Sequence, residues 1–159
     1  MVNNQKEALK IVKYSKYPPL GRRGAGFGFA HNEYKKENPI DVMEDANKTL
    51  INIIQIENES GLENVEEIAK IDDVDCLWVG HFDLSNFLGV PGQFDSKLYL
   101  DAIKKIVRVG EKYKKSLGIM VSTKQEMDFY SDLGFNVIAV GTEMKLLTDK
   151  ISNLVNNEG

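Results

Sequence analysis

The pattern of hydrophobic positions contains four short runs that are apolar almost without interruption. These runs cover residues 51–56, 76–80, 118–121 and 137–141. They lack the polar alternation of a strand that has one face in water. The pattern therefore predicts buried strands of a parallel sheet that is covered on both faces.

Helical patterns separate these runs. In residues 96–115, Tyr99, Ile103 and Ile106 recur at helical spacing, which predicts a long crossover helix. Thr123 opens a second pattern and Glu126 follows three residues later, as in a capping box. Shorter or terminal helices are predicted at residues 4–15, 62–70 and 143–156, and an irregular stretch follows the first of them.

The repeated strand–helix units predict an α/β fold, either a doubly wound sheet or part of a (β/α)8 barrel. Periodicity does not choose between the two. The turn after the first run reads ENESG and lacks the glycine-rich phosphate loop of a doubly wound nucleotide binder. The glycine-rich segment 21–29 precedes no clear strand–helix–strand unit, and it is interpreted as an irregular connection.

Two carboxylates follow two successive runs. Glu57 comes directly after the first run, and Asp83 lies in the loop after the second. Because parallel strands end at one mouth of the sheet, both acids are expected to face the same point. Oxygen ligands of this kind suit Mg2+ or Mn2+, whereas no histidine or cysteine spacing indicates zinc. The alternative is that both acids simply begin helices; His81 beside them is either a proton carrier or a structural residue.

Composition limits the function further. The 159 residues, 42% of them hydrophobic, suit one globular domain spanning 1–159, and the net charge of −4 comes without a basic stripe for nucleic acid. No apolar run is long enough for a bilayer and no signal peptide stands at the start, so a cytoplasmic protein is expected. Cys76, the one cysteine, is interpreted as a buried structural thiol.

Four motifs, in order, resemble a known family. They are YPPLGRRG at 17–24, QIE at 55–57, GHFDLS at 80–85 and IAVGTEMKLL at 138–147. In these motifs the chain resembles the HpcH/HpaI aldolases, the metal-dependent (class II) pyruvate aldolases of the 4-hydroxy-2-oxoheptanedioate type, within the aldolase and citrate lyase superfamily. The resemblance extends over nearly the whole chain.

The resemblance implies a TIM barrel, present here as a partial barrel of about strands five to eight with flanking helices. It implies that Glu57 and Asp83 bind Mg2+ or Mn2+. It also implies an aldolase that joins pyruvate, or another 2-oxo acid, to an aldehyde, and cleaves the 4-hydroxy-2-oxo acid in reverse. By the same resemblance, residues Gly80, His81, Phe82 and Asp83 surround the pyruvate carboxylate, and Met120 lies near the methyl group.

The departures from the family are informative. His81 stands in place of a proline and Phe82 in place of a small residue, which predicts a narrower pocket beside the metal. The catalytic histidine and the carboxylate-binding arginine of the family belong to its N-terminal half, and no residue of this chain matches them. We therefore expect a homo-oligomer or a complementing N-terminal half. Two alternatives remain: a non-catalytic half-barrel that retains the metal or 2-oxo acid site, and a lyase acting on citrate-like or acyl-CoA substrates.

Overall fold

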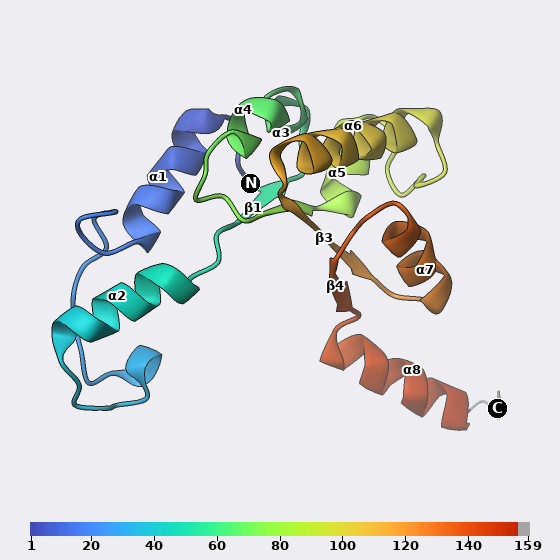
Figure 1. Cartoon of the computed structure of the whole chain (residues 1–159). Coiled ribbons are helices and arrows are strands. Elements are labelled where there is room, and N and C mark those ends of the chain that lie inside the picture. Colours follow the sequence, from blue (N-terminus) through green and yellow to red (C-terminus); the bar gives the residue numbers. More distant parts are fainter. Residues whose placement is uncertain (156–159) are drawn as a thin grey trace.

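The four apolar runs form one parallel sheet in the computed structural model, which describes residues 1–155 (Figure 1). The strands are β1 (Ile53–Ile56), β2 (Cys76–Val79), β3 (Ser116–Val121) and β4 (Val137–Val140). They lie in the order β1-β2-β3-β4, each parallel to its neighbour. The α/β class and the parallel sheet predicted from the sequence are confirmed.

Helices precede and connect the strands. They are α1 (Gln5–Ser15), η1 (Ala30–Asn32), α2 (Pro39–Thr49), α3 (Glu59–Glu63), α4 (Val65–Ala69), α5 (His81–Phe87), α6 (Lys97–Tyr113), α7 (Lys124–Asp132) and α8 (Glu143–Val155). None of these helices is long and apolar enough to cross a membrane.

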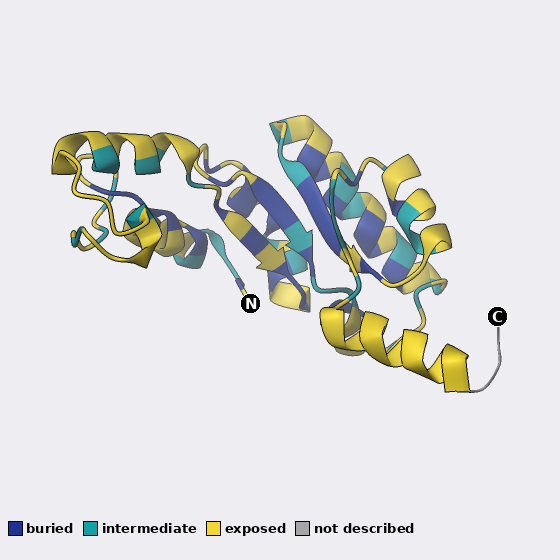
Figure 2. Cartoon of the chain, turned by 90° about the horizontal axis from the view of Figure 1, so that it is seen from below, coloured by how far each residue is buried: buried dark blue, intermediate teal, exposed yellow. Residues whose placement is uncertain are grey.

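One face of the sheet carries the core. Alternate strand residues are fully buried there, among them Ile54, Ile56, Leu77 and Val79. They form one hydrophobic cluster with residues of α4 and α6, the helices that cover this face (Figure 2). Each such side chain contributes about 1.5–3 kcal/mol when it leaves water, so this layer supplies most of the apolar stabilisation.

The opposite face is only partly covered over the described residues. Ile53 of β1 is 49% exposed and Met120 of β3 is 36% exposed, whereas Cys76 and Trp78 of the intervening strand β2 are buried and half-buried. The expectation of a sheet covered on both faces is therefore met on one face only. At the outer edge of β1, the N–H of Val2 donates to the carbonyl oxygen of Gln55 at 3.3 Å. This contact has the form of a strand pairing.

The predicted helices agree with the structure where capping signals are present. Asn4 caps α1, and the capping box of Thr123 and Glu126 opens α7. The pattern at 62–70 is divided into α3 and α4. The last helix is described to Val155, so the predicted end at Asn156 lies outside the described residues.

The short 3-10 helix η1 and two α-helices were not predicted. α2 lies in the stretch expected to be irregular, although Asn38 caps it and Pro39 is its first residue. α5 replaces the expected loop after β2. Its N-cap is Gly80, which offers no side-chain hydrogen bond, so the usual start signal is missing from the sequence.

Candidate functional site

Glu57 lies at the carboxyl end of β1 and is 7% exposed. It does not cap the following helix, because the side chain of Asn58 accepts the hydrogen bond from the N–H of Gly61. The Glu57 carboxylate instead accepts a hydrogen bond from Nε2 of Gln55, and its Oε1 lies 3.2 Å from the N-terminal ammonium of Met1. The buried carboxylate is therefore already paired with one positive group, and a metal cation at Glu57 would replace that ammonium.

The backbone after β2 packs directly on this carboxylate. The N–H of Gly80 donates to the carbonyl oxygen of Ile56 at 3.1 Å, which continues the pairing of β1 with β2 by one residue. A Cβ placed on Gly80 would lie 2.6 Å from Oε2 of Glu57. Only glycine therefore fits here without displacing Glu57.

Asp83 lies in the first turn of α5, immediately beyond Gly80, and is exposed. This position agrees with the alternative interpretation of Asp83 as an acid at a helix start, because the helix dipole favours a carboxylate there. Within residues 1–155, no hydrogen bond or ion pair occupies its side chain. The carboxylate remains available to a ligand, and the two interpretations are compatible.

The first N–H groups of α5 have no acceptor within their own helix, as at every helix start. They belong to His81, Phe82 and Asp83, and no side-chain cap satisfies them. Phe82 is exposed, and its ring lies 4.6 Å from that of His81. The predicted segment 80–83 thus forms the first turn of α5, and Gly80 at its start packs against Glu57.

A cavity of about 390 Å3 lies next to this turn, bounded by the α5–α6 connection, β3 and α7. We call it the His81 cavity. Its mostly apolar walls come from His81, Phe94, Leu100, Met120, Phe129 and Tyr130, and its polar lining from Asp95, Gln125 and Glu126. The structure therefore brings together two of the predicted substrate-binding residues, His81 and Met120.

Electrostatics in the His81 cavity favour a neutral histidine. Burial lowers the pKa of the His81 imidazole, and the negative charge of Glu126 opposes part of that shift. Backbone N–H groups of Ser122 and Thr123 donate to Glu126 and hold its pKa below the usual value. His81 is thus uncharged near neutral pH, and Glu126 is ionised.

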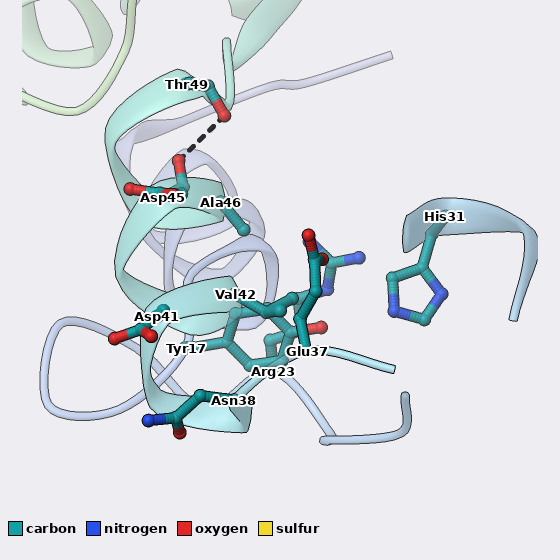
Figure 3. Close-up of a pocket in the computed structure, with 10 residues that line it drawn as sticks. All are labelled: Tyr17, Arg23, His31, Glu37, Asn38, Asp41, Val42, Asp45, Ala46 and Thr49. Atoms are coloured by element: carbon teal, nitrogen blue, oxygen red, sulfur yellow. Dashed lines mark hydrogen bonds between the residues drawn. The ribbon is translucent and has the colours of Figure 1, made fainter. Parts of the chain in front are cut away.

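Arg23 and His31 lie in a different cavity, of about 470 Å3, between the segment after α1 and helix α2 (Figure 3). The guanidinium of Arg23 stacks on the ring of Tyr17, 4.6 Å from its centroid. No strand residue and no residue of the 80–83 turn lines this cavity. The structure therefore does not bring Arg23 or His31 into the candidate site.

Sequence reasoning missed several residues of the site. Gln55 holds Glu57 in place, and its signal was a polar residue inside an apolar strand, two positions before the acid. Phe94, Phe129 and Tyr130 come from separate elements, and no local pattern relates them.

The donor set fits a hard divalent cation. Glu57 and Asp83 offer only oxygen atoms as ligands, which Mg2+ and Mn2+ prefer. Bound to two carboxylates, either cation keeps coordination positions for other ligands. Within residues 1–155, no group of three or more His, Cys, Asp or Glu side chains gathers as a complete metal cage. A cation held by Glu57 and Asp83 would therefore need further ligands besides these two carboxylates.

Comparison with known proteins decides the family. The model of the HpcH/HpaI aldolase/citrate lyase family matches residues 1–149. The chain belongs to this family. Among HpcH/HpaI relatives, a hydroxypyruvate/pyruvate aldolase of Delftia acidovorans is 32% identical over 147 residues, covering 92% of this chain and 54% of the relative. A 4-hydroxy-2-oxo-heptane-1,7-dioate aldolase of Shigella flexneri is 31% identical over the same length, covering 92% and 55%.

The fold agrees with that assignment. The crystal structure of an HpcH/HpaI aldolase from Desulfitobacterium hafniense superimposes with a TM-score of 0.89 at 24% identity, covering 98% of this chain and 60% of the other. The chain therefore spans a little over half the length of these HpcH/HpaI relatives.

Proposed function

We propose that this chain carries the cation- and 2-oxo-acid-binding part of an aldolase that forms or cleaves 4-hydroxy-2-oxo acids through a pyruvate enolate. The observation that carries the proposal is the buried Glu57 carboxylate, against which Gly80 packs closely. The exposed carboxylate of Asp83 follows in the next helical turn. Family membership and the names of two aldolase relatives support the same reaction class.

In this proposal Glu57 and Asp83 are the ligands of Mg2+ or Mn2+. When bound, the cation supplies positive charge that stabilises negative charge developing on the keto oxygen of pyruvate. Gln55 orients Glu57 through its hydrogen bond, and the missing side chain of Gly80 lets the 80–83 turn approach.

The same turn would bind pyruvate. The N–H groups of His81, Phe82 and Asp83 offer donors to the pyruvate carboxylate, as the family resemblance implies, and they have no side-chain cap. Met120, exposed at the carboxyl end of β3, would contact the methyl group. These residues bind and orient the substrate, while the base that removes the methyl proton is not assigned to any residue of this chain.

We propose further that residues 1–159 form one domain of a partial (β/α)8 barrel with strands five to eight. The partly covered sheet face and the edge of β1, paired only with Val2 over the described residues, are where further strands would pack. A complementing N-terminal half or a second copy of the chain would supply that cover.

The second candidate is a non-catalytic subunit that retains the cation site. It is favoured by the exposed residues of the sheet face opposite the core. The two candidates differ in turnover but share the site.

The test is exchange of pyruvate methyl protons for deuterium in D2O, followed by NMR with Mg2+ or Mn2+. The proposal predicts metal-dependent exchange that is lost on chelation and in Asp83→Ala. Asp41→Ala is the matched control, because Asp41 is also an exposed acid in a first helical turn, that of α2. Absence of exchange from folded chain that still binds Mn2+ would favour the non-catalytic subunit.

A further inference from the structure

The His81 cavity adjoins the proposed pyruvate site. His81 lies between Gly80, which touches Glu57, and Asp83. Met120 is shared by the cavity and by the proposed contact with the pyruvate methyl group. A molecule in this cavity would therefore lie beside the carbon that becomes the nucleophile.

The walls of the cavity are mostly apolar, and the Tyr130 hydroxyl among them already has a hydrogen-bond partner. The hydroxyl of Tyr130 is 2.9 Å from that of Tyr99, so this polar group is paired within the protein. Phe129 is 46% exposed, so its ring gains by being covered. The rings of His81 and Phe94 are 5.1 Å apart and meet edge to face, an arrangement that a further ring can extend.

The charges around the cavity select against anions. Its lining contains the carboxylates of Asp95 and Glu126 and no lysine or arginine among the described residues. A carboxylate on a bound molecule would meet like charge without a cation to pair with. The volume, about 390 Å3, is that of a small-molecule pocket.

We propose that the His81 cavity binds the side group of the aldehyde substrate, and that this group is neutral and aromatic. This inference rests on the proposed function. In the reaction, the methyl carbon of pyruvate loses a proton and bonds to the aldehyde carbon. The carbonyl π bond of the aldehyde breaks, and its oxygen takes up a proton. The product is a 4-hydroxy-2-oxo acid with the aromatic group on carbon 4, directed into the cavity.

The test uses alcohol analogues, which do not react with lysine as aldehydes do. Benzyl alcohol and 4-(hydroxymethyl)benzoate are titrated into the full chain, and binding is followed by ligand-observed NMR. Benzyl alcohol is expected to bind roughly tenfold more tightly than the carboxylated analogue.

Substitutions in and outside the cavity test whether benzyl alcohol binds in the His81 cavity. Phe129→Ser is expected to lower the affinity for benzyl alcohol roughly tenfold. Phe87→Ser should leave that affinity unchanged, because Phe87 on α5 is similarly exposed, at 44%, but lies outside the cavity. Glu126→Gln keeps a side chain that can accept the capping hydrogen bonds but removes the charge, so it should improve binding of the carboxylated analogue.

Equal binding of both analogues, or equal effects of Phe129→Ser and Phe87→Ser, would overturn the inference. The pyruvate exchange assay on the same wild-type sample separates it from the proposed function. Exchange without benzyl alcohol binding removes the cavity assignment alone. Binding without exchange removes the reaction, and the aldehyde role of the cavity with it.

Discussion

Gly80 and Glu57 form a matched pair across strands β1 and β2: a Cβ on Gly80 would lie 2.6 Å from Oε2 of Glu57 and 2.7 Å from its Cβ. The backbone of Gly80 has a φ of −83°, which any residue adopts. The requirement for glycine is therefore one of space and not of backbone conformation. It arises because the turn that leads to Asp83 must pass close to a buried carboxylate.

This relationship predicts the effect of Gly80→Ala. The new methyl group must displace the Glu57 carboxylate, so Mn2+ affinity is expected to fall roughly tenfold or more. Gly24→Ala is the matched control, because nothing lies within 4 Å of a Cβ at Gly24. Water-proton relaxation during titration with Mn2+ measures the affinity of both variants. If the two variants bind Mn2+ equally, the close approach has no bearing on the cation site.

The hydroxyl pair of Tyr99 and Tyr130 predicts a coupled effect on stability. Both residues are buried, and Tyr99→Phe removes the partner of the Tyr130 hydroxyl. We expect this change to cost about 1–3 kcal/mol in the free energy of unfolding. Adding Tyr130→Phe removes the unpaired hydroxyl, so the double variant should lose less than the sum of the single ones. Urea unfolding measures the cycle, and simple additivity would argue against the pair.

His81 predicts how stability depends on pH. Burial lowers its folded-state pKa below the ordinary 6.5, so the unfolded chain binds the proton first as the pH falls. The fold therefore loses stability as the pH drops below 6.5, until the lower folded-state pKa is passed.

The comparison is between wild type and His81→Gln, by urea unfolding from about pH 8 to 5. Wild type should lose more stability on acidification than His81→Gln. His31→Gln is the control for loss of a histidine, because His31 is exposed and lies outside the site. Parallel curves for wild type and His81→Gln would show that burial of His81 has no such cost.

Much of the fold was predictable, because its signals are local. The strands were found through uninterrupted apolar runs, and α7 through the capping box of Thr123 and Glu126. The helix α2 was missed although Asn38 and Pro39 carry a start signal. The helix α5 was missed because Gly80 offers no side-chain cap, although the helix buries Leu84 and Ser85.

The site was predictable only in part. Glu57 follows β1 and Asp83 lies in the first turn of the helix after β2, as the order of the chain predicts, whereas their meeting at one point and their role as cation ligands stay predictions. The contact of Gly80 with Glu57 depends on strand register, which no local pattern specifies. The His81 cavity draws on β3, α6 and α7 together, so its shape depends on tertiary packing.

Binding of Mn2+, followed by the EPR signal of the free ion during titration of the full chain, tests the central claim most directly. The account predicts that wild type removes Mn2+ from solution, and that Asp83→Ala and Glu57→Gln each abolish this binding. Glu59→Gln, a change at an exposed glutamate two residues away, should leave it intact. Wild-type binding that persists in both Asp83→Ala and Glu57→Gln would contradict the assignment of these carboxylates as cation ligands.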